Sequence, residues 1–300
     1  LFFERVYVLL GSSDGTFTLA HQQSLGVRPG LQPRAVALGD VDRNNDLDIV
    51  VASTNDDYGA YDDSSVIILL GNGDGTFGAP MEADVDEGPV AVSVGFVDDD
   101  TDLDVVTANI QRGYVDDYLV PVSSTVSVLI GNGNGTFEPP RDFGVNTGAR
   151  DVALGFVDLD GDLDIVTANS YIMPDKNTQP YYFPMSSVSV LIGHGNGTFQ
   201  DAQHTDVALG AFELALGHVD DDTDLDIVTA NTYFDYDERI QDSSVSVLIG
   251  NGNGTFVETE NVPLGLRSLN EIAMMPAGGN GTVNVLITVD LNKDLLTFPI

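Results

Sequence analysis

The chain has 300 residues, of which 42% are hydrophobic, and its 47 acidic against 11 basic residues give a formal net charge of −36. This hydrophobic content excludes an acidic disordered polymer. The charge argues against binding nucleic acid or anionic lipid through a basic surface, and it favours cationic partners or a high-salt habitat. Cysteine is absent, which excludes disulfides and thiolate metal sites, and no apolar run approaches the roughly 20 residues that span a bilayer. Because no basic segment followed by an apolar one opens the sequence, we expect Leu1 to begin a processed or partial chain.

In chain order, short β-type segments alternate with acidic loops and glycine-rich turns. Residues 6–10 and 16–25 predict two strands. The first complete unit then predicts strands over residues 35–39, 47–52, 66–70 and 76–85, with a polar loop over residues 53–65. The segment Val-Ile-Ile-Leu-Leu at residues 66–70 is continuously apolar, so we expect it to be buried on both faces.

Two sequence landmarks recur every 57 to 62 residues. The first is a turn of the type Gly-Asn-Gly-Asn-Gly-Thr-Phe, which ends at Phe17, Phe77, Phe137, Phe199 and Phe256. The second is a ladder of alternating Asp residues followed by an apolar strand, over residues 40–50, 98–106, 158–166 and 220–228. Such a repeat predicts units that must stack on their neighbours to bury a core.

Four short antiparallel strands in a unit of about 60 residues are typical of a β-propeller blade. We therefore predict an all-β fold, a β-propeller of about five four-stranded blades, as a single domain over residues 1–300. The strands of a blade are named A to D outward from the axis. Predicted A strands lie near residues 35–39, 91–95, 151–155, 213–217 and 271–275, and predicted C strands near residues 66–70, 126–130, 188–192 and 245–249. The complete repeats span about residues 34–85, 90–145, 150–208 and 212–264.

The fifth blade is divided between the two ends of the chain. Residues 270–300 supply an A strand, a B strand and, over residues 295–300, a further C strand, whereas residues 1–26 supply a C and a D strand. We predict that pairing of the N- and C-terminal segments closes the ring. One C strand is then surplus: it caps the edge of the ring, or the N-terminal pair inserts into a neighbouring subunit and starts a polymer.

The first ladder carries oxygen side chains at alternate positions, namely Asp40, Asp42, Asn44, Asp46 and Asp48. Carboxylate and amide oxygens are the ligands of Ca²⁺, which takes six to eight of them at about 2.3–2.6 Å. A residue that tolerates backbone reversal is needed at the sixth position, and Asn45 and, in the third ladder, Gly161 suit it. The first ladder therefore predicts a Ca²⁺ site.

The other three ladders depart from this pattern at the first position, where Phe96, Phe156 and His218 stand. Thr101 and Thr223 at the turn position are unfavourable at positive φ. The remaining candidate metal ligands are Asp98, Asp100, Asp102, Asp104, Asp158, Asp160, Asp162, Asp164, Asp220, Asp222, Asp224 and Asp226. For each ladder the alternative is a set of turns in which Asp accepts backbone N–H bonds, but so many carboxylates without a cation would repel one another.

These ladders, the Leu-Asp-Ile-Val strands after them and the glycine-rich turns resemble the FG-GAP or VCBS-type repeats of integrin α-subunit propellers and of secreted bacterial and fungal propeller proteins, including propeller lectins. The resemblance covers about residues 5–290. It implies a secreted, extracellular or cell-surface propeller with Ca²⁺ in the A–B loops. It implies little about the ligand, because the family spans adhesion, sugar binding and scaffolding. Integrin propellers have seven blades, whereas this chain has material for five.

Tyrosine is concentrated in the predicted B–C loops, which we take as the face for a ligand or partner because tyrosine combines apolar area with a polar tip. The residues are Tyr58, Tyr61, Tyr114, Tyr118, Tyr171, Tyr181, Tyr182, Tyr233 and Tyr236. The alternative is that these side chains pack the loops on themselves. Sequons mark Asn134, Asn196, Asn253 and Asn280 as candidates for N-glycosylation, although the first three fall within the repeated turn, so the fold itself can dictate them.

We expect a non-enzymatic, secreted module for adhesion or assembly, with a protein partner or self-association through the chain ends, as in a subunit of an extracellular filament. The alternative is a carbohydrate-binding lectin that uses the tyrosine-rich loops. A propeller hydrolase or lyase is less favoured, because the four His residues occupy dissimilar places and no Ser–His or Cys–His arrangement is suggested. We expect neither nucleic-acid binding nor membrane insertion.

Overall fold

The computed structural model of the chain describes residues 5–25, 31–55, 64–115, 118–174, 182–235, 240–265, 269–276, 283–289 and 295–299. These residues form strands and turns and contain no helix, so none of them forms a helix able to cross a membrane. The chain divides into two compact units: Leu1–Asn109 with Val126–Asp142, and Ile110–Thr125 with Phe143–Ile300. Each unit is described by itself.

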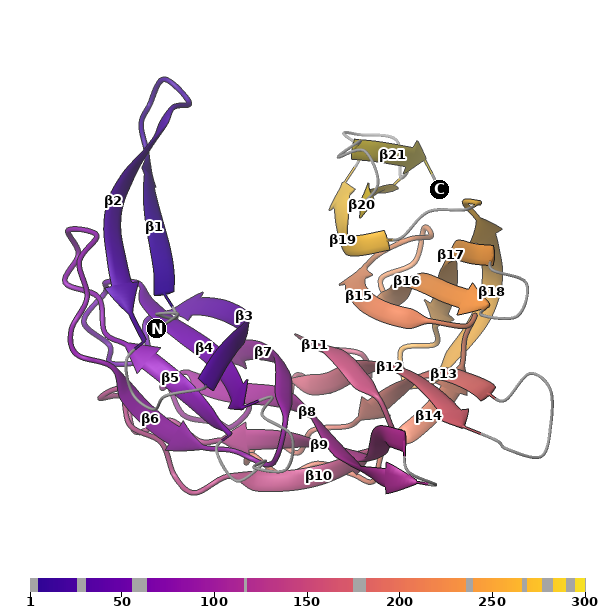
Figure 1. Cartoon of the computed structure of the whole chain (residues 1–300), viewed down its shortest axis with the longest axis horizontal. Helices are drawn as coiled ribbons and strands as arrows, with labels where there is room; N and C mark the ends of the chain where they lie inside the picture. The colour runs from indigo at the N-terminus through magenta and orange to yellow at the C-terminus, as the bar shows by residue number, and fades with distance from the viewer. Residues whose placement is uncertain are drawn as a thin grey trace. The chain divides into compact units, whose positions relative to one another are not determined.

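The strands form consecutive antiparallel meanders (Figure 1). The first unit begins with a hairpin of β1 (Arg5–Gly11) and β2 (Phe17–Ser24), followed by a sheet of β3 (Leu31–Gly39), β4 (Asp48–Asn55), β5 (Ser65–Leu69) and β6 (Met81–Asp84). The next sheet consists of β7 (Pro89–Gly95), β8 (Asp104–Val115), β9 (Tyr118–Leu129) and β10 (Arg141–Val145).

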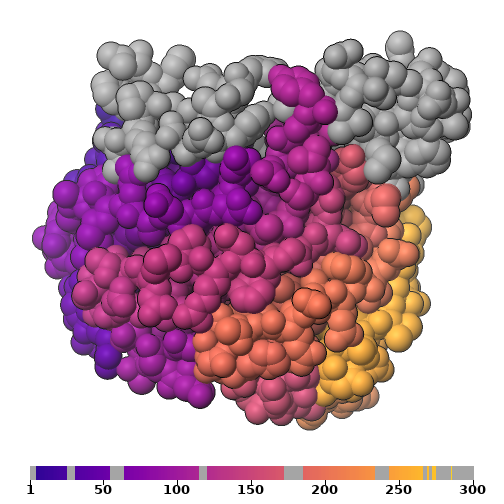
Figure 2. Space-filling model, turned by 90° about the horizontal axis from the view of Figure 1, so that it is seen from below, coloured from indigo at the N-terminus to yellow at the C-terminus, as the bar shows by residue number. Residues whose placement is uncertain are grey.

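The second unit contains three further meanders. Their strands are β11 (Ala149–Gly155), β12 (Asp164–Pro174), β13 (Tyr182–Leu191) and β14 (Gln203–Asp206); β15 (Ala211–Gly217), β16 (Asp226–Asp235), β17 (Ile240–Gly250) and β18 (Phe256–Pro263); and β19 (Leu269–Pro276), β20 (Val283–Val289) and β21 (Leu295–Pro299). In the space-filling view of one face, the atoms of β15–β18, in orange to yellow, form a continuous surface (Figure 2).

The predicted strand pattern is confirmed: four sheets have four strands in the order A to D, and the two chain ends supply two and three strands. The C strand β5 is buried at every residue, as its continuous apolar sequence predicted. These antiparallel meanders are consistent with a propeller. The hairpin β1–β2 and the sheet β19–β20–β21 are separate sheets in the strand pairing, so the closure of a ring, the number of blades and the single domain over residues 1–300 stay predictions.

The B and C strands of the later sheets are longer than predicted. Strand β12 pairs with β13 through Tyr171↔Met185 to Pro174↔Tyr182, and β16 pairs with β17 through Tyr233↔Asp242 to Asp235↔Ile240. Tyr171 and Tyr233 therefore lie in strands rather than in B–C loops, as does Tyr114 in β8. The polar composition that predicted loops is compatible with strands here because both segments pair with each other along their length.

The core lies between successive sheets. In the first unit Val50, Val66 and Ile68 of β4 and β5 pack with Val105 and Leu129 of the following sheet. In the second unit the corresponding layer joins the faces of β12–β13 and β15–β17, and it consists of Val166, Ala168, Val188, Val190, Leu214, Ile227 and Leu248. Within each unit, successive sheets thus pack face to face, which is why their central strands are rich in apolar residues.

Candidate functional site

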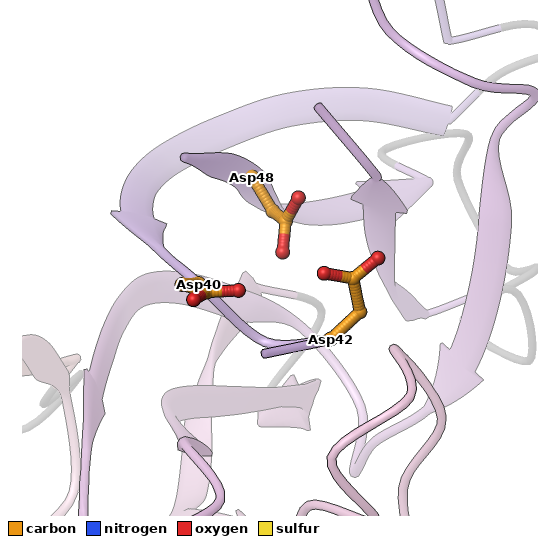
Figure 3. Close-up of side chains that lie close together, drawn as sticks. All are labelled: Asp40, Asp42 and Asp48. Atoms are coloured by element: carbon orange, nitrogen blue, oxygen red, sulfur yellow. The ribbon is translucent and has the colours of Figure 1, made fainter. Parts of the chain in front are cut away.

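The loop between β3 and β4 brings three carboxylates together. One oxygen each of Asp40, Asp42 and Asp48 lies within 4.8 Å of the other two, and their side chains converge in Figure 3. Asp48 is fully buried, whereas Asp40 and Asp42 are half-buried. Oxygen donors at this spacing suit a hard divalent cation, so this cluster could hold a metal ion.

Local backbone geometry creates this arrangement. Arg43 and Asn45 adopt positive φ, at 61° and 69°, which reverses the chain at the position where the sequence predicted it. The two oxygens of Asp40 accept the backbone N–H groups of Asn44, at 2.9 Å, and Asn45, at 2.8 Å. Asn44 Oδ1 in turn accepts the Asp46 N–H at 2.6 Å. The first-position Asp is therefore what folds the loop inward.

Asp48 joins two loops of the same sheet. Its Oδ2 accepts the Val41 N–H at 2.8 Å, and its Oδ1 accepts the Gly71 N–H at 2.7 Å from the turn after β5. The same pair of bonds, from the second ladder residue and from the first glycine of the turn, is made by Asp104, Asp164 and Asp226. We call these four residues the latch aspartates: Asp48, Asp104, Asp164 and Asp226.

All four latch aspartates are fully buried. Burial raises the pKa of Asp104 and of Asp164 to about 6, although the two backbone N–H bonds to each carboxylate lower it. Burial also raises the pKa of Asp48. The prediction of metal ligands did not foresee this role. Both oxygens of each latch aspartate accept a backbone hydrogen bond, which agrees with the structural alternative for this ladder position.

The glycines of the repeated turn fit against the ladder. A Cβ on Gly71 would lie 2.3 Å from the Leu47 carbonyl oxygen, and one on Gly73, whose φ is +72°, would lie 2.5 Å from Asp46 Oδ1. The third glycine reaches the preceding sheet, where Gly135 N donates to Val41 O and Gly254 N to Val157 O, each at 3.1 Å. The glycine-rich turn and the Asp ladder are therefore in contact with each other, although the sequence predicted two separate features.

The other three ladders keep the turns without the three-carboxylate cluster. In the second, Asp100 N donates to Asp98 Oδ1 at 3.0 Å and Asp102 N to Asp100 Oδ1 at 2.7 Å, and the third and fourth ladders repeat both bonds. Burial, reinforced by the neighbouring carboxylates Asp100 and Asp160, raises the pKa of Asp98 and Asp158. Among the described residues, only the first ladder gathers three acidic ligand atoms within 4.8 Å.

The residues that replace the first Asp explain this difference. Phe96 and Phe156 are 51% and 47% exposed, so they do not fill the loop, and His218 Nδ1 lies 2.8 Å from the Asp224 carbonyl oxygen. Thr101 and Thr223 are not among the residues with positive φ, whereas Gly161 is, at 102°. Asp102 also forms an ion pair with Arg43 at 2.9 Å, which links the first two ladders.

The predicted tyrosine face is described only in part. Tyr114 is 64% exposed, and Tyr171 and Tyr233 are half-buried. Tyr171 lines a hollow of about 410 Å³ with Asn146, Met185, Asp206 and Leu209, and burial raises its pKa. Tyr58, Tyr61, Tyr181 and Tyr236 lie outside the described residues, and the side chains of Tyr118 and Tyr182 are not described.

The three described sequons have a structural explanation. Asn134 Oδ1 accepts the backbone N–H of Thr136 at 2.9 Å and its hydroxyl at 2.6 Å, and Asn196 and Asn253 make the same two bonds. Asp14 and Asp74 make them in the other two turns. The turn thus needs an Asx residue two positions before Thr, and glycosylation of these residues stays a prediction. Asn280 lies outside the described residues.

The close fit of Gly73 predicts a position-specific cost of substitution. Gly73→Ala should lower the free energy of unfolding by about 1–3 kcal/mol, because alanine is strained at this φ and its Cβ would displace Asp46. Gly78→Ala is the matched control, since its Cβ would meet only the Leu70 oxygen at 3.7 Å, and it should be neutral or slightly stabilising. Urea unfolding of both variants measures the difference, and equal stabilities would contradict the proposed contact.

Comparison with known proteins agrees with this geometry. The model of a family described as an FG-GAP-like repeat matches residues 3–51, which include the first ladder and the hairpin before it. No curated protein matches the chain. Residues 3–51 thus contain an FG-GAP-like repeat, and the same ladder and turn recur in the following sheets with the same latch bonds.

Proposed function

We propose that the chain is a secreted, calcium-stabilised β-propeller that serves adhesion or assembly and has no catalytic role. The calcium part of the proposal is supported by the cluster of Asp40, Asp42 and Asp48. Asn44 and Asp46 would complete an oxygen-rich ligand set, and the family resemblance implies Ca²⁺ in this loop. The bound ion would neutralise carboxylates that otherwise repel one another.

Calcium should therefore stabilise the protein through the first ladder. We expect the Tm to rise when Ca²⁺ replaces a chelator and the rise to shrink strongly in Asp42→Asn, which removes a charged ligand but keeps an acceptor for the Asn44 N–H. Asp99→Asn, at an exposed position outside the alternating ligand series, is the control with the same charge change. Thermal melts and calcium titration calorimetry measure both effects, and equal Tm values with and without Ca²⁺ would sink this proposal.

The assembly part is supported by one observation: the first strands expose side chains whose counterparts in later repeats are buried. Leu9 is 58% exposed, whereas the leucines two residues before the first glycine in the next four turns, Leu69, Leu129, Leu191 and Leu248, are 0% exposed. Phe17 is 69% exposed, against 8% and 7% for Phe199 and Phe256. The hairpin thus exposes a face whose counterpart is buried in the C strands β5, β9, β13 and β17.

The A strand β3 repeats this contrast. Val36 is 60% exposed, whereas its counterparts Val152 and Leu214 are 6% exposed. Leu9, Val36, Leu38 and Leu47 line one apolar hollow of about 540 Å³ within the first unit. A contiguous apolar surface of this kind is typical of an interaction site.

We infer that a further β-sheet covers this surface. In a five-bladed ring the strands of residues 269–299 would supply it, which is the predicted closure of the ring through the chain ends. In a filament, the same strands of a neighbouring copy would supply it. Closure of the ring would require a C strand from the N-terminus to pair with the edge of β20 opposite β19. Strand β21 already pairs with that edge, for example through Leu286↔Thr297, which favours the filament.

Leu38→Lys places a charge in this surface and should disrupt whatever covers it. If copies assemble, the variant should have a smaller mass in light scattering than the wild type at equal concentration. If the ring closes within one chain, both proteins should be monomers and the variant should have a lower Tm. Gln22→Lys, at an exposed polar position, is the control. Unchanged mass and unchanged Tm in Leu38→Lys would mean that the surface is free in solution, contrary to the proposal.

A lectin is the second candidate, favoured by the hollow beside Tyr171. An aromatic ring with Asn146 and Asp206 in a hollow of about 410 Å³ combines a stacking surface with polar groups that can orient a sugar. We expect a glycan array to give saturable binding that Tyr171→Ala weakens by about tenfold and that Tyr114→Ala, at an exposed tyrosine outside the hollow, leaves intact. Absence of binding to every glycan would reject this candidate.

A further inference from the structure

The five A strands share an irregularity that the sequence did not reveal. Each pairs with its B strand through a register shift at the same position, which inserts one extra residue into the A strand. The inserted residues are Arg34, Val90, Arg150, Phe212 and Asn270. Such bulges re-aim a side chain and are over-represented next to functional sites. The bulge is therefore present in each of the five A strands, while the type of the inserted residue differs from one repeat to the next.

Two of these inserted residues meet within the second unit. The Arg150 guanidinium carbon lies 5.0 Å from the centre of the Phe212 ring, the geometry of a cation–π contact. Arg150 is half-buried and Phe212 is 40% exposed, so this pair reaches the surface. A guanidinium over an aromatic ring keeps the N–H groups at its edge available for hydrogen bonds.

Arg150 has an unsatisfied hydrogen-bond donor among the described residues. Its Nε atom is buried and has no hydrogen-bond partner. Burial, followed by the positive charge of Arg112, lowers the pKa of Arg150 to about 10. The adjacent carboxylate of Asp151 is engaged elsewhere, since it accepts the Val152 N–H at 2.8 Å and the Leu214 N–H at 2.9 Å. In a chain with 47 acidic residues, a partly buried arginine whose pKa is lowered by the charge of a second arginine is unexpected.

We propose that Arg150, Phe212 and Arg112 form a binding site for the carboxylate of a sugar acid, a uronate. This site is separate from the calcium loop and from the hollow beside Tyr171, and it does not depend on the function proposed above.

The chemistry of the three side chains fits this ligand. A guanidinium matches the two oxygens of a carboxylate through parallel N–H bonds, which are stronger than neutral hydrogen bonds. Arg112 is exposed and supplies a second positive charge, and the open part of the Phe212 ring offers an apolar surface to the C–H face of a pyranose. The net charge of −36 opposes anion binding over long distances, but at physiological salt that field is screened beyond roughly 8 Å.

Titration calorimetry with calcium-loaded protein at physiological salt tests the site with D-galacturonate and its neutral counterpart D-galactose. We expect galacturonate to bind and galactose not to bind. Arg150→Gln should weaken galacturonate binding by about tenfold or more. The matched control is Arg141→Gln, which removes the same charge from an arginine paired with Glu138 at 2.8 Å. This control should bind galacturonate as the wild type does.

Three results would overturn the proposal: equal binding of the two sugars, unchanged galacturonate binding in Arg150→Gln, or binding of a short acidic peptide in place of galacturonate.

The folding of the Arg150→Gln variant is checked separately by thermal melting. Because Arg150→Gln removes the contact with the Phe212 ring but no hydrogen bond of Nε, it should lower the Tm only slightly and should keep the same response to Ca²⁺. A failure of the calcium proposal would appear in that response and would leave the sugar comparison unaffected.

Discussion

The buried carboxylate at the end of each ladder is the interaction on which the repeated part of this protein depends. Each latch aspartate accepts one N–H from its own A–B loop and one from the turn after the C strand. A buried carboxylate without such bonds would be costly, so the loop and the turn must form together. These bonds hold together the A–B loop and the turn after the C strand, which lie at the same end of the strands. The faces of the sheets then pack on one another within each unit.

This dependence explains why each of the four ladders is followed by a glycine-rich turn in the sequence. The turn needs glycine because the ladder lies against it, and the ladder needs its last Asp because the turn donates to it. In the terminal sheet Asn284 stands where the other repeats have the latch aspartate.

The sequence predicted the strands and their order well, because apolar runs, glycine turns and a fixed period are local signals. It predicted the carboxylate cluster of the first ladder for the same reason. It could not separate Asp48, which serves the fold, from Asp40 and Asp42, because all three have the same residue type and spacing. It also could not locate the bulge that pairs Arg150 with Phe212, since register depends on hydrogen bonds between strands rather than on composition.

The third glycine of each turn has a consequence for how the protein unfolds. Because Gly135 donates to Val41, and Gly254 to Val157, a repeat is tied to the loop of the repeat before it as well as to the adjoining sheet face. Stability in such an array spreads from neighbour to neighbour. An ion held by the first ladder would therefore stabilise more than its own loop, and the sheet β19–β21, where Asn284 replaces the latch aspartate, is expected to open more readily than the sheets with a latch.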